Sequence, residues 1–187
     1  MLNEILEETA KLTKKEQMTI NLAILIDNAE DVLLAQIKEL AEKVKNLKII
    51  TKNISRFSYI EEELYVQYGI AMQITNNRIK ALLNTDIIIN FDFNESRINE
   101  YEIPDLVTII NIQNAIQINK ENYKGKIINN YKIDYDKELL EGLEDKKDFD
   151  NNVLYESLIY RKDTYSNIKS QLFKDNVRIL LNPLTKI

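Results

Sequence analysis

Seven polar residues stand at the ends of apolar runs, where side chains of different chemistry could meet at a ligand site. One pair follows residues 20–26, three residues follow residues 47–51, and two lie at the end of residues 86–93. The carboxylates could hold Mg²⁺, and the basic residues could bind a phosphate or a carboxylate. The candidate binding residues are Asp27, Asn28, Lys52, Asn53, Arg56, Asn90 and Asp92.

The composition excludes several classes of catalytic site. The chain of 187 residues contains no cysteine and no histidine, which removes thiol nucleophiles, histidine acid–base catalysis and most transition-metal sites. The three glycines, Gly69, Gly125 and Gly142, are far apart, so no glycine-rich loop can cradle a phosphate. The sequence therefore assigns no catalytic residue and predicts no metal site.

The charge pattern narrows the expected partners and location. A formal net charge of −5 argues against a nucleic-acid groove, which needs clustered lysine and arginine. The sequence has no apolar stretch long enough to span a membrane, and its first residues carry acids where a signal peptide carries bases. We therefore expect a cytoplasmic protein that binds neither nucleic acid nor membrane.

The order of apolar runs predicts the elements that must position these side chains. Residues 20–26 are typical of a strand buried on both faces, and an apolar stripe at helical spacing follows from Leu33 to Leu47. A short helix is also expected over residues 76–84. The expected strands are residues 20–26, 47–51, 70–75, 86–93 and 106–112. Residues 126–135 are expected to form either a last strand or a hairpin about Asn129-Asn130. This alternation predicts an α/β fold with a doubly wound, mostly parallel, Rossmann-like sheet of about five to six strands.

Three parts of the chain differ in character. Residues 1–18 are expected to form an amphipathic helix, and residues 19–135 form the Rossmann-like domain. Residues 136–187 begin with an acidic stretch and are expected to form a helical appendage. Because the terminal helices offer apolar stripes that a monomeric sheet domain does not need, a homo-oligomer or a protein partner is expected there.

Two motifs resemble the nucleotide-binding half of the shikimate dehydrogenase and glutamyl-tRNA reductase group. Residues 51–56, TKNISR, are similar to the group's N-R-T strand end, and residues 85–90, TDIIIN, are similar to its aDiiIN strand. The resemblance implies a Rossmann-type fold that binds NADP or NAD. It implies cofactor contacts from Lys52, Asn53 and Arg56, with Asn90 on the nicotinamide side.

The turn after the first strand differs from that group, because acids replace the glycine-rich loop. Asp27, Glu30 and Asp31 crowd the expected start of a helix, where a pyrophosphate would need unoccupied amides and a positive potential. Asn28 is instead expected to be the N-cap of that helix, with Asp31 stabilised by the helix dipole. This pattern disfavours a dinucleotide in the usual position and predicts no cofactor.

A receiver domain of a two-component system is a further comparison. In that interpretation Asp27 and Asp31 would hold Mg²⁺, and Asp92 would accept a phosphoryl group. The 65 residues between Asp27 and Asp92 contain an additional strand–helix unit, and no lysine ends the fifth expected strand. Both features depart from the receiver pattern.

Two functional hypotheses follow from the sequence. The first is a non-catalytic Rossmann-like module that binds a partner or a copy of itself, and it rests on the missing catalytic residue types. The second is an NAD(P)-dependent oxidoreductase, or a degenerate relative, that uses the crevice at the carboxyl ends of the strands.

Overall fold

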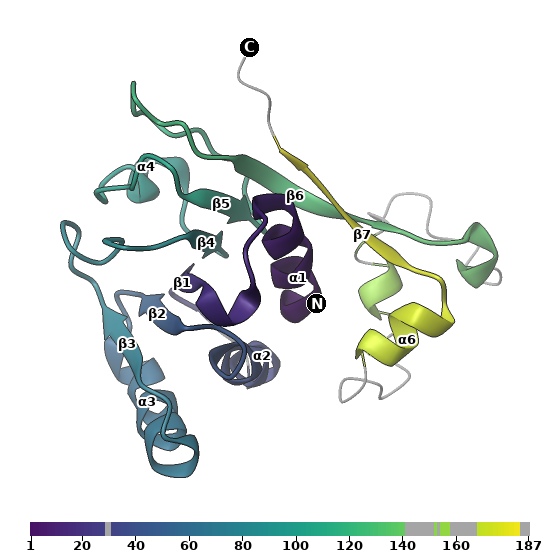
Figure 1. Cartoon of the computed structure of the whole chain (residues 1–187), viewed down its shortest axis with the longest axis horizontal. Helices are drawn as coiled ribbons and strands as arrows, with labels where there is room; N and C mark the ends of the chain where they lie inside the picture. The colour runs from purple at the N-terminus through teal and green to yellow at the C-terminus, as the bar shows by residue number, and fades with distance from the viewer. Residues whose placement is uncertain (29–30, 141–151, 153, 158–167, 184–187) are drawn as a thin grey trace.

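A computed structural model of the chain describes residues 1–28, 31–140, 152, 154–157 and 168–183. Its centre is a seven-stranded sheet in the order β3-β2-β1-β4-β5-β6-β7 (Figure 1). The strands are β1 (Asn21–Leu25), β2 (Asn46–Ile50), β3 (Met72–Thr75), β4 (Ile87–Asn90), β5 (Thr108–Asn111), β6 (Ile127–Asp134) and β7 (Arg178–Pro183).

The first six strands are parallel, and their order is that of the Rossmann fold. The predicted doubly wound α/β sheet is therefore confirmed. The order reverses between β1 and β4, which lie side by side although more than sixty residues separate them, as in the pairing of Leu25 with Asn90. Ligands bind at this position in open α/β sheets, beyond the carboxyl ends of the strands.

Helices and short turns of helix connect the strands. They are α1 (Leu2–Thr13), η1 (Gln17–Thr19), α2 (Asp31–Ala41), α3 (Ile54–Tyr68), α4 (Glu95–Ile98), η2 (Lys137–Leu140) and α6 (Ile168–Lys174). Gly69 ends α3 at a φ of 66°, a left-handed conformation that glycine adopts without strain. None of the helices in the described part of the chain combines the length and apolar character needed to cross a bilayer.

Alternate residues of the central strands enter two separate cores. Leu22 and Ile24 of β1 pack into the core that includes side chains of α1, α2 and α3. Ala23 and Leu25 enter the core on the opposite face, which includes Ile98 of α4. Because strand side chains alternate between faces, the uninterrupted apolar run of β1 is a consequence of burial on both sides.

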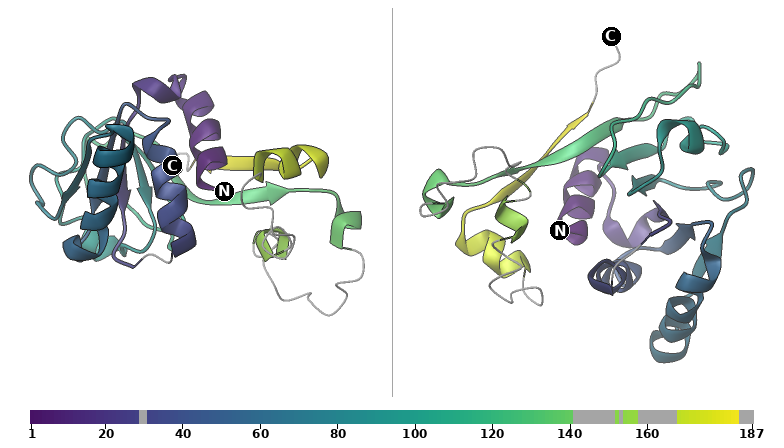
Figure 2. Two further views of the ribbon diagram at one scale, coloured as in Figure 1. Left: turned by 90° about the horizontal axis from the view of Figure 1, so that it is seen from below. Right: turned by 180° about the vertical axis from the view of Figure 1, so that it is seen from behind.

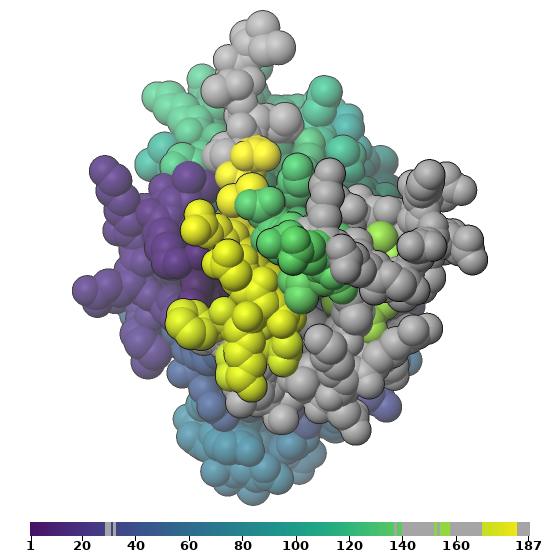
Figure 3. All heavy atoms as spheres, turned by 90° about the vertical axis from the view of Figure 1, so that its right-hand side faces the viewer, coloured from purple at the N-terminus to yellow at the C-terminus, as the bar shows by residue number. Residues whose placement is uncertain are grey.

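The N-terminal helix uses its apolar stripe inside this chain. Leu2, Ile5 and Leu6 of α1 are buried in the same core as Ile179 of β7. Figure 3 shows the C-terminal strand lying against this helix. The stripe predicted to serve a partner is therefore covered by the chain's own sheet.

The C-terminal part is not wholly helical, in contrast to the expectation for residues 136–187. β7 adds a seventh strand, antiparallel to β6, and the β6–β7 ribbon extends past the ends of the other strands, with α6 beside it (Figure 2). The run VRILL of residues 177–181 supplies the apolar residues of this strand. Much of the acidic stretch and of the two helices expected after it lies outside the described residues.

The short helix expected over residues 76–84 is a series of turns. The Asn77 side chain accepts hydrogen bonds from the amides of Ile79 and Lys80, as a capping residue does. The chain then adopts a left-handed conformation at Asn84, with a φ of 57°.

Asp86 links the amino end of β4 to that of β1. Its carboxylate accepts hydrogen bonds from the backbone amide of Asn21 at 2.8 Å, from the Asn21 side chain at 2.9 Å and from Lys15 Nζ at 2.5 Å. Burial acts to raise the pKa of Asp86, but the bonds from Lys15 and Asn21 together outweigh it, so the pKa lies below its ordinary value. Folding is therefore linked to ionisation of this carboxyl group.

The substitution Asp86→Asn should lower the free energy of unfolding at neutral pH by about 1–2 kcal/mol, since it removes a charged acceptor of three hydrogen bonds. A lowered pKa stabilises the fold above the unfolded-state pKa of Asp86, and this contribution disappears as the pH falls through the folded-state pKa. The difference between variant and parent, measured by urea unfolding, should therefore shrink on acidification. Asp105→Asn, at an exposed pair with Lys120, is the matched control, and an equal pH dependence of the two variants would contradict the assignment.

Candidate ligand cleft at the carboxyl ends of the strands

The carboxyl edge of the sheet brings together five of the seven candidate residues. Asp27, Lys52, Asn53, Asn90 and Asp92 all follow or end β1, β2 or β4, which are neighbours in the sheet. Hydrogen bonds connect several of them, such as that from Asn53 Nδ2 to the carbonyl oxygen of Asp27 at 2.8 Å.

The two remaining candidates differ, because Asn28 contacts this group and Arg56 lies at its edge. Asn28 takes part through its backbone amide, which donates a hydrogen bond to Asp92. Arg56 lies in the first turn of α3 with an exposed side chain. α2 begins at Asp31, and residues 29–30 lie outside the described part of the chain, so capping by Asn28 stays a prediction.

The carboxylate of Asp92 occupies the turn that follows β1. It accepts hydrogen bonds from the amide of Asp27, at 3.0 Å to both oxygens, and from the amide of Asn28, also at 3.0 Å. These amides belong to the turn whose counterpart in dinucleotide-binding proteins faces a pyrophosphate. Burial raises the pKa of Asp92 above its ordinary value, and the hydrogen bond from Asn28 offsets only part of this effect.

The carboxylate of Asp27 points the other way, toward the element that follows β4. It is buried and accepts hydrogen bonds from the amide of Lys52 and from Arg97 Nη2, each at 2.9 Å. Arg97 Nη1 contacts its second oxygen, and Lys52 Nζ lies 3.3 Å from the same atom. The contacts of Asp27 with Arg97 and of Asp92 with the amides of residues 27 and 28 are called the carboxylate bridge below.

Two further contacts hold the Arg97 guanidinium in place. It lies over the ring of Phe93, with 3.6 Å between the guanidinium carbon and the ring centroid, in a cation–π contact. The Asn94 side chain caps α4 by accepting a hydrogen bond from the Arg97 amide at 2.9 Å. Backbone and side chain of Arg97 are therefore both positioned before any ligand binds.

Asn90 belongs to a row of three asparagines, with Asn111 at the end of β5 and Asn129 opposite it in β6. Its side-chain amide donates to Asn111 Oδ1 at 2.9 Å, and Asn111 donates to Asn129 Oδ1 at 2.7 Å. Asn90 also exchanges hydrogen bonds with the backbone of Phe93. Since both ends of the Asn90 amide have partners, a ligand on the side of β4 and β5 would have to displace them.

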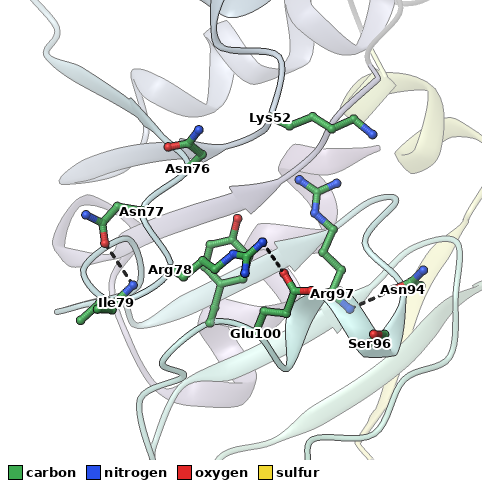
Figure 4. Close-up of a pocket in the computed structure, with 10 residues that line it drawn as sticks. Lys52, Asn76, Asn77, Arg78, Ile79, Asn94, Ser96, Arg97 and Glu100 are labelled. Atoms are coloured by element: carbon green, nitrogen blue, oxygen red, sulfur yellow. Dashed lines mark hydrogen bonds and ion pairs between the residues drawn. The ribbon is translucent and has the colours of Figure 1, made fainter.

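An open cleft of about 790 Å³ lies beside the bridge (Figure 4). Residues after β2 and β3 form one wall, and residues of α4 and the turn after it form the other. The lining residues are Lys52, Asn76, Asn77, Arg78, Ile79, Asn94, Ser96, Arg97, Glu100 and Tyr101. Cations outnumber acids in this lining although the chain as a whole is acidic.

The arrangement suits reversible binding of an anionic or polar molecule. Arg78 pairs with Glu100 at 3.1 Å, and both side chains are exposed, so water screens the pair and a ligand can compete for the arginine. Within the described residues, no group of three or more acidic side chains is placed to hold a metal ion.

Sequence reasoning identified Lys52 but did not single out Arg78 or Arg97. The overlooked signal is the segment of residues 94–97, NESR. An asparagine three residues before Arg97 is a typical helix cap, and a short helix after the fourth strand would direct its first turn toward the site.

Asp27→Asn should lower the free energy of unfolding by about 2–4 kcal/mol, because it leaves the partly buried Arg97 without its anion. Lys52→Gln should cost only about 0–1 kcal/mol, since an exposed cation gains little from pairing. Lys52 is 66% exposed and Arg97 is 24% exposed. Urea unfolding of both variants measures these changes in the free energy of unfolding. Equal decreases in the two variants would show that the Asp27–Arg97 pair stabilises the fold no more than the exposed Lys52 does.

Comparisons with known proteins place this chain in no family. No family model matches the sequence, and no curated protein matches it. Among solved structures, the chain is similar to an imine reductase from Aspergillus terreus in complex with NADPH4, with 12% sequence identity and a TM-score of 0.37. The similar region covers 53% of this chain and 34% of that chain. At this level of similarity the strand order alone identifies the fold as Rossmann-like.

Proposed function

We propose that this protein is a non-catalytic Rossmann-like binding module that takes a small ligand in the cleft between β2, β3 and α4. One observation carries the proposal. The carboxylate bridge occupies the turn after β1 with the protein's own groups, whereas the cleft beside it is open and lined by polar side chains. Its volume lies within the range of small-molecule sites.

The alternative is an NAD(P)-dependent oxidoreductase or a degenerate relative, in line with the resemblance to the shikimate dehydrogenase and glutamyl-tRNA reductase group. A dinucleotide in the usual position would have to displace Asp92 from the amides of residues 27 and 28. Its nicotinamide end would also compete with the partners of Asn90. Each displaced group would lose hydrogen bonds that the nucleotide must replace, and this weighs against the alternative.

Ligand-detected NMR can test the module hypothesis with a probe set of neutral sugars, sugar acids, sugar phosphates, NAD and NADP. At least one small polar probe should bind the parent protein, and Ser96→Trp, which fills the cleft, should abolish that binding. Ser58→Trp adds the same side chain on the exposed surface of α3 and should leave binding intact.

The result that favours the oxidoreductase is a rise of several degrees in melting temperature with NADP or NAD that persists in Ser96→Trp. If no probe binds, or if Ser96→Trp leaves the binding of every probe unchanged, the module hypothesis is wrong.

Self-association is a second candidate function, and α3 favours it over the terminal helices. Five large side chains of α3 are exposed although they are apolar or aromatic: Ile54, Tyr59, Tyr65, Val66 and Tyr68. α3 packs beside β3, which is the edge strand of the sheet. Apolar side chains beside a strand edge are typical of contacts between subunits.

If a second copy covers this surface, the parent chain should form a dimer in sedimentation equilibrium, and Tyr65→Glu should shift it to the monomer because an unpaired charge would be buried. Leu106→Glu places the same charge at another exposed apolar position and should leave the dimer unchanged. A parent chain that stays monomeric at high concentration would contradict self-association.

A further inference from the structure

We propose that the ligand of the cleft is a phosphomonoester with a polar body, such as a phosphorylated sugar or polyol, whose phosphate is held by Lys52, Arg78 and Arg97. This inference rests on the proposed function and adds the chemical class of the ligand. It depends on three features of the cleft: its charge, the positioning of one arginine and the chemistry of its walls.

The charge of the cleft lining suits an anion. The lining has three cations, Lys52, Arg78 and Arg97, and one carboxylate, Glu100. The carboxylates of Asp27 and Asp92 interact with Arg97 and Lys52 from beside the lining. Glu100 is exposed and holds Arg78 only through a surface pair, which a ligand can replace at little cost. Once it does, Arg78 has no counter-charge in the lining, and a phosphomonoester, which carries close to two negative charges at neutral pH, can supply it.

Arg97 presents a guanidinium that is already oriented. Asp27 engages both terminal nitrogens, and Phe93 supports the plane from one side. A guanidinium has five N–H donors, so donors remain for phosphate oxygens beyond those used by Asp27. Because the side chain is ordered before binding, little conformational entropy is lost when the ligand arrives. Asp27 is in this sense a positioning residue.

Lys52 and Arg78 approach from other elements. The Lys52 ammonium lies beyond β2 and is 66% exposed, and Figure 4 shows its end and that of Arg97 converging from opposite walls. Arg78 follows β3, and its guanidinium lies lower in the same cleft, beside Glu100. A phosphate between these three side chains would meet a cation from each wall.

The remaining lining favours a polar body over a nucleobase. Asn76, Asn77 and Ser96 offer amide and hydroxyl groups at the surface of the cleft, which suit the hydroxyl groups of a sugar. The aromatic residue of the lining, Tyr101, is only 7% exposed and lends no face for stacking. Nucleobases are commonly held by such aromatic faces, so this cleft selects against them.

Isothermal titration calorimetry at constant ionic strength with ribose 5-phosphate, ribose and ribonate tests the inference. Ribose 5-phosphate should bind at least about tenfold more tightly than ribose, because the charged group adds charge-assisted hydrogen bonds. It should also bind more tightly than ribonate, which carries one negative charge. Lys52→Gln and Arg78→Gln should each weaken ribose 5-phosphate by about tenfold and leave ribose unchanged.

Lys124→Gln removes the same charge at an exposed position outside the cleft and should change nothing. Equal binding of ribose and ribose 5-phosphate that Ser96→Trp abolishes would overturn the phosphate assignment and leave the binding module standing. Binding of ribonate as tight as that of ribose 5-phosphate would assign a carboxylate instead. If no probe binds, or if the two cleft variants behave as the control does, the phosphomonoester assignment is wrong.

Discussion

Two carboxylates, those of Asp92 and Asp27, connect the loops that follow β1 and β4. The positions of both loops depend on the hydrogen-bond partners of these two groups. Neighbouring parallel strands whose connections leave in opposite directions create a gap at the edge of the sheet. In this protein Asp92 fills the gap from one side with bonds to the amides of residues 27 and 28. Asp27 spans it from the other side through Arg97. A buried carboxylate is tolerated only with such partners, so the two interactions constrain both loops.

The bridge also determines where a ligand can lie. Because Asp27 draws Arg97 and Lys52 toward itself, the cations gather at the side of the gap that faces β2 and β3. The opposite side is taken up by the amides of Asn90 and Asn111. The open space is therefore displaced from the usual dinucleotide position and acquires a positive character that the overall composition would not suggest.

The sequence was sufficient to predict the doubly wound sheet and the edge of it at which most of the candidate residues meet. An apolar run such as residues 20–26 predicts a strand from neighbouring residues alone. Gly69 likewise predicts the end of α3 from its residue type and position. The strand order follows from the alternation of strands and helices. The seventh strand was not predicted as part of the sheet, because the pairing of β7 with β6 joins segments far apart in the chain.

The site was predicted less completely than the fold, for a related reason. Asp27 and Asp92 stood out by type and position, but their partners could not be read from local patterns. The partner of Asp27 is an arginine 70 residues away in the sequence. The spacing of apolar and polar residues does not predict a pair so far apart. The acids of the first turn suggested repulsion of a phosphate, whereas Asp27 is in fact neutralised by neighbouring cations. Glu30 lies outside the described residues.

The row of Asn90, Asn111 and Asn129 has a consequence for the chemistry that this edge tolerates. Asn90 donates to Asn111, Asn111 donates to Asn129, and Asn129 donates to the carbonyl oxygen of Ile116, while Asn90 also donates to the carbonyl oxygen of Phe93. Such a one-way relay needs a side chain that is donor and acceptor at once and carries no charge. Deamidation of the middle residue would turn its donor into a second acceptor facing Asn129 Oδ1. Slow deamidation at that nitrogen would therefore break the contact with Asn129 and keep the acceptor that Asn90 uses.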